Sequence, residues 1–133
     1  MSYLLDTNWL ADFLAGRQPA IDLVQVLLQD GIAISIITYL EIVEGILGSR
    51  DPETAGNDFR RLLEGIEVIG VSEAVADRTA ATRLELRRKK SAIEHRSLDL
   101  LIAATAIEYD LSLVTRNVRD YQDIVGLRLH SSQ

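Results

Sequence analysis

Acidic and amide side chains follow four apolar segments of this sequence, close to where each segment ends. Asp6 directly follows "YLL", and Glu41 lies shortly after "IAISI". Asp99 stands in "SLDLLIAATAI", a stretch with almost no polar face, and Asn117 and Asp120 follow "LSLVT". Carboxylate and amide oxygens are ligands that suit Mg²⁺ or Mn²⁺. The four places together predict one oxygen-rich site for a hard divalent cation.

Each of these residues also has a structural interpretation when it is taken alone. Asp6 is a suitable N-cap for a following helix, and a single glutamate such as Glu41 is common on a solvent face. Asp99 falls in the first turn of a helix, where the helix dipole favours an anion. Asn117 and Asp120 are ordinary turn residues. The joint placement, more than any single residue, favours the metal site.

Gly45 is the unusual member of a polar stripe that includes Glu41. Thr38, Glu41, Glu44 and Gly45 share one helical face by i, i+3, i+4 spacing. A glycine inside a helix costs about 0.5–1 kcal/mol relative to alanine. We therefore expect close packing or a nearby ligand at Gly45.

Strands and helices that alternate along the chain must position these side chains. Periodicity and turn residues predict strands at 3–5, 32–36, 66–71 and 111–115, with a further one at 127–130. Helices are expected at 8–15, 20–29, 38–47, 52–64 and 97–109, and from a cap at Ser72 to about residue 90. This pattern predicts one α/β domain spanning residues 1–133, with a mainly parallel sheet. The carboxyl ends of parallel strands form the usual binding edge.

Composition narrows the classes of function. The chain has 133 residues, no cysteine and a net charge of −6. The missing cysteines exclude disulfides and thiolate metal sites, and no apolar run reaches membrane-spanning length, so we expect a cytoplasmic protein without a membrane segment. The negative charge argues against wholesale non-specific binding to nucleic acid. The segment 83–96 is an exception to this negative average, because it contains six Lys or Arg residues. This basic segment is either a solvated helix end or a local patch that faces phosphates.

The segments "LLDTNWL", "ISIITYLEIVEGI" and "SLDLLIAATAIEYDLSLVTRNVRDY" resemble the PIN domain, and specifically VapC-type toxin ribonucleases of VapBC toxin–antitoxin modules. The resemblance extends from residue 3 to about residue 129. It implies a three-layer α/β/α fold with a central sheet of four or five strands. It also implies an endoribonuclease that hydrolyses RNA phosphodiester bonds with Mg²⁺ or Mn²⁺.

The resemblance also implies roles for individual residues. The acidic metal positions correspond to Asp6, Glu41 and Asp99, and the fourth position is either Asn117 or Asp120. The hydroxyls of Thr7 and Thr115 are expected to orient ligands or metal-held water, and Asn8 to brace the first helix. The side chains expected to contact RNA phosphates are Arg87, Arg88, Arg96 and Arg116, with His95 as a further candidate. His130 is expected to be an ordinary surface side chain.

A VapB-type antitoxin and a second copy of the chain are the protein partners that the resemblance implies. The antitoxin would lie in an apolar groove around Trp9, Phe13 and Tyr39, although Trp9 is equally explained by core packing. A receiver-like domain is disfavoured because "VIGVSEA" ends without an aspartate, and a haloacid dehalogenase-type phosphatase because position 8 is Asn. A PIN fold that binds RNA or protein with weakened catalysis is the alternative that Asn117 leaves open.

Overall fold

A computed structural model describes residues 2–91, 93 and 96–130 of the chain. The strands are β1 (Tyr3–Leu5), β2 (Ile32–Ser35), β3 (Glu67–Ile69) and β4 (Ser112–Val114). The helices are α1 (Thr7–Leu14), α2 (Gln18–Leu28), α3 (Ile36–Leu47), α4 (Pro52–Leu63), α5 (Glu73–Arg88), α6 (Ser97–Glu108) and α7 (Val118–Tyr121). The elements expected up to β4 are confirmed, with ends displaced by a residue or two. No helix within the described ranges is long and apolar enough to cross a bilayer.

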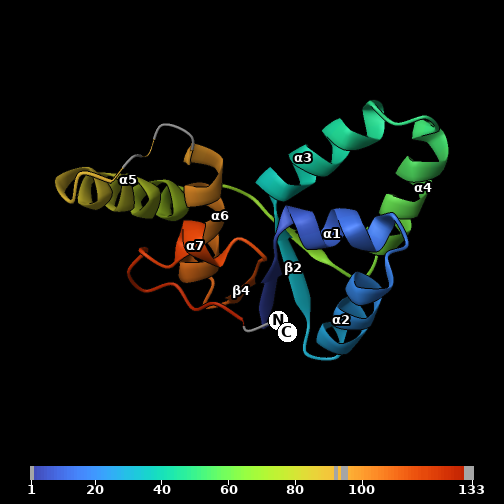
Figure 1. The fold of residues 1–133 in the computed structure, drawn as a ribbon, viewed down its shortest axis with the longest axis horizontal. Coiled ribbons are helices and arrows are strands. Elements are labelled where there is room, and N and C mark those ends of the chain that lie inside the picture. The colour runs from blue at the N-terminus through green and yellow to red at the C-terminus, as the bar shows by residue number, and fades with distance from the viewer. Residues whose placement is uncertain (1, 92, 94–95, 131–133) are drawn as a thin grey trace.

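The four strands form one parallel sheet in the order β3-β2-β1-β4. Helices α1 to α4 lie on one side of it and α5 to α7 on the other, which gives the expected three-layer α/β/α arrangement (Figure 1). The chain passes from β1 outward through β2 to β3 and then returns to place β4 on the free side of β1. The order of the strands therefore reverses between β1 and β4, and such a switch point is where open α/β sheets form their binding crevice.

Alternation along the strands divides the core into two clusters. Leu4 faces the side covered by α5, α6 and α7, while its neighbour Leu5 faces α1 and α2. Ala33 and Ile34 of β2 divide in the same way. Successive side chains of a strand point to opposite faces, so strands that are apolar throughout require helices on both sides. Thus the continuous apolar runs in the sequence account for both layers of helices.

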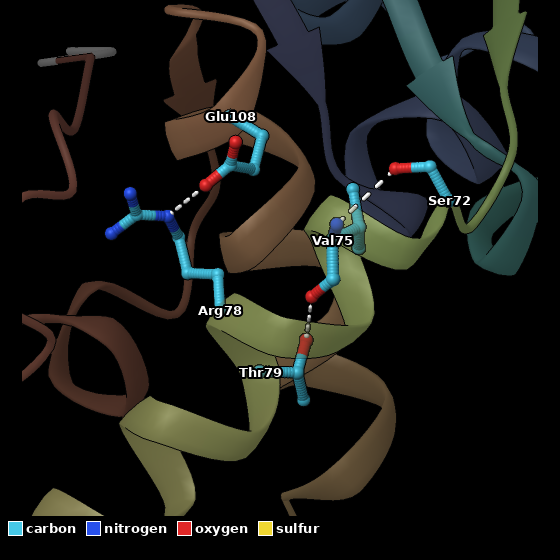
Figure 2. Close-up of polar contacts among 5 residues, drawn as sticks. All are labelled: Ser72, Val75, Arg78, Thr79 and Glu108. Atoms are coloured by element: carbon cyan, nitrogen blue, oxygen red, sulfur yellow. Dashed lines mark hydrogen bonds and ion pairs between the residues drawn. The ribbon is translucent and has the colours of Figure 1, made fainter.

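Helices α5 and α6 pack together through polar as well as apolar contacts (Figure 2). The Ser72 hydroxyl accepts a hydrogen bond from the backbone N–H of Val75 at 3.2 Å, so the expected N-cap is confirmed. The Thr79 hydroxyl donates to the carbonyl of Val75 at 2.8 Å, and Arg78 forms an ion pair with Glu108 of α6. The first two contacts stabilise α5 itself, and the ion pair holds α6, which carries Asp99, against it.

The segment 127–130 does not form a fifth strand. Only Leu129 pairs with the sheet, opposite Leu113 of β4, in an isolated bridge. Leu113 donates to the carbonyl of Arg128 at 2.9 Å and accepts from the N–H of His130 at 2.8 Å. A single bridge does not extend into a ladder, so the sheet of the described residues has four strands.

Two residues differ from their sequence-based interpretation. A Cβ built on Gly45 would meet no atom within 4 Å, so close packing does not explain that glycine. His130 is not an ordinary surface residue, since its ring packs edge-on against Tyr3 with centroids 5.2 Å apart. Its Nδ1 is buried and has no hydrogen-bond partner among the described residues. Its role in the structure is therefore to cover the amino end of the sheet.

Candidate functional site

Asp6 lies at the junction of β1 and α1, with both carboxylate oxygens held in place. Oδ1 accepts from the backbone N–H of Thr7 at 2.8 Å, which makes Asp6 the N-cap of α1. Oδ2 accepts from the hydroxyl of Thr115 at 2.6 Å. The side chain is 5% exposed. The capping role and the site position therefore coexist, because the cap uses one oxygen and a hydroxyl beyond β4 orients the other.

Glu41 faces α1 from the first half of α3. The hydroxyl of Thr7 donates to Oε1 of Glu41 at 2.6 Å and lies 3.2 Å from the hydroxyl of Thr38. Thr38 is fully buried and Glu41 is half-buried, while Glu44 is exposed. The polar stripe of α3 is therefore not simply a solvent face, because its first turns point toward Asp6.

Asp99 is half-buried in the first turn of α6. Burial raises the pKa of its carboxyl group, and the negative charge of Asp6 raises the pKa further. The charges of Asp120 and Glu41 act in the same direction. The carboxylates of Asp6, Glu41 and Asp120, from the end of β1, α3 and α7, thus lie close enough to influence Asp99 of α6. Figure 1 shows α1 and α3 leaving from the same end of the strands, the end that Asp6 follows.

Tyr121 is a member of this site that the sequence did not single out. The residue is 1% exposed, and its hydroxyl makes no hydrogen bond of ordinary geometry with a described residue. The hydroxyl nevertheless lies near enough to Asp99 to lower the pKa of that carboxyl. Burial, followed by the charges of Asp6 and Asp99, raises the pKa of Tyr121 itself. In the sequence, Tyr121 follows "RD" in an apparent turn, and this position does not indicate that the side chain is buried.

The two candidates for the fourth group lie around the short helix α7. Asn117 is exposed, and its side chain does not cap the helix, although its backbone N–H donates to the Thr115 hydroxyl at 3.1 Å. Asp120, in the first turn of α7, contributes to the raised pKa of Asp99. Electrostatics therefore connects Asp120 with the other three carboxylates. The side chain of Asn8 is exposed and makes no hydrogen bond within the described ranges.

The donor set has the chemistry that a hard cation requires. Its members are carboxylates, which suit Mg²⁺ or Mn²⁺. A bound divalent cation would neutralise their negative charges and so remove the repulsion on Asp99. Among the described residues, no group of three or more His, Asp or Glu side chains is close enough to hold an ion as it stands. The residues therefore fit a divalent cation by type and charge, and binding would draw the carboxylates together.

Two of the expected RNA contacts are engaged within the protein. Arg96 forms an ion pair with Asp123, at 2.8 Å between Nη2 and Oδ1. The guanidinium of Arg116 lies 3.9 Å above the ring of Trp9 and pairs with Asp12.

The other basic candidates differ from these two. Arg87 and Arg88 are exposed at the end of α5 and form no ion pair with a described residue. His95 lies outside the described residues.

Comparison with known proteins identifies the family. Residues 3–126 match the PIN domain. Ribonuclease VapC1 of Haemophilus influenzae (strain R2866) is 29% identical over 130 residues, with 96% of each chain covered. The tRNA(fMet)-specific endonuclease VapC of Shigella flexneri is 30% identical over 129 residues, also covering 96% of each chain.

Solved structures agree with this assignment. VapBC2 from Rickettsia felis, bound to a promoter DNA fragment, superposes with a TM-score of 0.86 at 29% identity and covers 98% of both chains. VapBC-1 from nontypeable Haemophilus influenzae gives a TM-score of 0.83 at 27% identity, again with 98% of both chains covered. The fold, the shared acidic crevice and these likenesses lead to one conclusion: the chain belongs to the PIN domain family, in its VapC branch.

Proposed function

We propose that this protein is a toxin of a toxin–antitoxin pair, an endoribonuclease that hydrolyses RNA phosphodiester bonds with the help of Mg²⁺ or Mn²⁺. The observation that carries the proposal is the gathering of Asp6, Glu41, Asp99 and Asp120 at the carboxyl edge of the sheet. The charges of the other three all raise the pKa of Asp99. Relatives of similar length carry the names ribonuclease and endonuclease.

The carboxylates would act as the ligands of the ion. A divalent cation bound there would lower the pKa of an attacking water molecule and polarise the scissile phosphate. Asp6 and Asp99 are suited to hold it, with Asp120 as the fourth group. Glu41, whose carboxylate accepts from Thr7, is placed to hold a second ion or to orient the water. The hydroxyl of Thr115 would keep Asp6 turned toward the ion.

Two exposed cations at the end of α5 are suited to position an RNA backbone. Arg87 and Arg88 form no ion pair with a described residue, whereas Arg96 and Arg116 are paired with acidic side chains. Phosphate contacts of this kind position a nucleic acid without reading its sequence. Transfer RNA is the substrate to test first, since one relative is named for cleavage of tRNA(fMet).

The layer formed by helices α1 to α4 offers a surface for a partner protein. A hollow of about 300 Å³ lies between α1, α3 and α4, with Leu14 and Ile46 in its lining and Asp51 and Asp58 among its polar groups. Beside it, α3 exposes Leu47. An apolar hollow with acidic groups suits an amphipathic segment that carries Lys or Arg.

This hollow defines the proposed antitoxin groove. Its lining begins at Leu14, next to Phe13, and does not include the other two expected residues. Trp9 is buried, and Tyr39 packs on Phe59 with ring centroids 5.5 Å apart. A homodimer, as expected for the family, is part of the same proposal.

The test is cleavage of purified tRNA and of mixed RNA by the isolated protein, with Mn²⁺ and then with EDTA. We expect discrete fragments with Mn²⁺, none with EDTA, and none from an Asp6→Asn variant in either condition. RNA binding without cleavage by the wild-type protein would favour the alternative function, a PIN fold that only binds. Cleavage by the Asp6→Asn variant at the wild-type rate would place the reaction elsewhere.

A further inference from the structure

Arg96 joins the helix that carries Asp99 to the helix that carries Asp120. Its guanidinium donates twice to Asp123, from Nη1 to Oδ2 at 3.0 Å and from Nη2 to Oδ1 at 2.8 Å. Nη2 also donates to the backbone carbonyl of Asp120 at 2.6 Å. The Arg96 side chain is 17% exposed. Both terminal nitrogens therefore donate to α7 and the residues after it, while the buried Nε makes no hydrogen bond with a described residue.

Helix α7 has few other means of holding its position. It is four residues long, and its N-cap residue, Asn117, makes no side-chain capping bond. A helix this short has no stability of its own in water, so tertiary contacts must fix it. The buried ring of Tyr121 supplies one such contact, the hydrogen bond from the Asn117 N–H to the Thr115 hydroxyl supplies a second, and Arg96 supplies a third.

Electrostatic repulsion acts against this placement of α7. The charge of Asp120 is one of those that raise the pKa of Asp99, after burial and the charge of Asp6. Like charges repel, so a cation between the two segments favours their approach. The hydrogen bonds from Arg96 to Asp123 and to the carbonyl of Asp120 place its cation there. The hydrogen bond to Asp123 is the main cause that raises the pKa of Arg96, and the charges of Asp120 and Asp99 add to it.

We propose that Arg96 is a positioning residue that holds α7, and with it Asp120, against the start of α6, so that less rearrangement is needed when a divalent cation draws the carboxylates together. This inference rests on the proposed function, and it replaces the sequence-based expectation that Arg96 contacts RNA. Asp123 is the anchor of the clamp, because it accepts both side-chain hydrogen bonds from the Arg96 guanidinium.

The experiment compares Arg96→Gln, Asp123→Asn and the double variant by titration with Mn²⁺ alone, followed by electron paramagnetic resonance of the free ion. Removing a group that orients metal ligands lowers metal affinity by about 10–100-fold in other sites. We expect each single variant to lose Mn²⁺ affinity in that range. The double variant should lose no more than the worse single one, because both changes break the same contact.

A matched control exists at the opposite end of the sheet. Arg128 pairs with Asp110 at 2.9 Å and donates to the carbonyl of the same residue at 2.8 Å, which reproduces the chemistry of the clamp away from the carboxylates. Arg128→Gln should leave Mn²⁺ affinity unchanged. Circular dichroism and the metal-free Tm establish that each variant is folded. Arg96→Lys, which keeps the charge but not the two-pronged contact, serves if Arg96→Gln does not fold.

RNA binding separates a clamp from a phosphate contact. A clamp predicts that Arg96→Gln and Asp123→Asn bind RNA with the wild-type dependence on salt. A phosphate contact predicts that the slope of log affinity against log salt falls by roughly one for Arg96→Gln alone. That second result, or wild-type Mn²⁺ affinity in Arg96→Gln or Arg96→Lys, overturns the proposal.

The two proposals fail in different ways. A wild-type protein that binds Mn²⁺ without cleaving RNA refutes the nuclease function, and the clamp is still decided by the Mn²⁺ affinities of the variants. A wild-type protein that binds no Mn²⁺ refutes both.

Discussion

The Asp99 carboxyl group ionises less readily in the folded protein than in the unfolded chain. Burial and the charge of Asp6 raise its pKa above the ordinary value of an aspartate. The folded protein therefore binds this proton more tightly than the unfolded chain does. Stability falls as the pH rises from the unfolded pKa through the folded one, and above the folded pKa the destabilisation is fully present.

Replacing this residue should accordingly separate stability from activity. We expect Asp99→Asn to lose at least about 100-fold in RNA cleavage, as removal of a metal ligand should exceed the effect of losing an orienting group. At pH 7 the metal-free variant should have a higher Tm than the wild type, and the difference should vanish at a pH below the unfolded pKa. Calorimetry at the two pH values tests this. Asp77→Asn, at an exposed position on α5, is the control for which neither property should change.

The hydroxyl of Thr115 offers a test of how far orientation matters. Thr115→Val keeps the shape of the side chain but removes the donor that holds Oδ2 of Asp6 at 2.6 Å. We expect a loss of about 10–100-fold in Mn²⁺ affinity or cleavage. Thr105→Val is the matched control, since Thr105 is also fully buried but donates to the carbonyl of Leu101 within its own helix. Equal activity in the two variants would contradict an orienting role for Thr115.

At the scale of elements, local patterns predicted the strands and the long helices but missed the short helix α7. Helix α6 was evident because nearly every position in it is apolar, and the structure buries much of that helix. The four residues of α7 are too few to show a period. The run 127–130 was expected to be a fifth strand, but it meets β4 only in the bridge between Leu129 and Leu113.

Long-range contacts explain what the sequence could not supply at the site. The acids could be predicted because each follows an apolar segment and the carboxyl ends of parallel strands share an edge. The partners of Arg96 and Arg116 could not, since Asp123 and Asp12 lie 27 and 104 residues away. A run of cations in a sequence does not show which of them are paired in the fold. For the same reason, the burial of Tyr121 was visible only in the structure.

Helix α6 should tolerate change on one side of Asp99 and not on the other. Leu100 is 1% exposed in the core between α6 and the sheet, whereas Leu98 is 44% exposed. Leu100→Ala should lower the free energy of unfolding by about 2–5 kcal/mol. Leu98→Ala should change it by less than about 0.5 kcal/mol. Urea unfolding measures both, and a similar effect of the two changes would contradict this orientation of α6.

At the scale of the whole molecule, the chain has a net charge of −6 and concentrates several of its negative charges in one crevice. A cation that binds only the folded state adds stability by mass action, about 2.7 kcal/mol when its concentration is a hundred times the dissociation constant. For a chain of this size, that corresponds to a rise in Tm of roughly 10 °C. Saturating Mn²⁺ should therefore raise the Tm of the wild-type protein, and EDTA should reverse the rise.

The Asp99→Asn variant tests whether this thermal shift comes from an ion bound at the carboxylate cluster. It should begin with the higher metal-free Tm at pH 7, because the buried charge is gone, and it should gain little from Mn²⁺. The two melting curves are thus expected to approach or cross as Mn²⁺ is added to both proteins. Non-specific screening by salt would instead raise both curves alike, so NaCl at equal ionic strength is the control. Parallel curves with Mn²⁺ would mean that the ion binds outside the cluster of Asp6, Glu41, Asp99 and Asp120, and the assignment of these four residues to one cation site would be wrong.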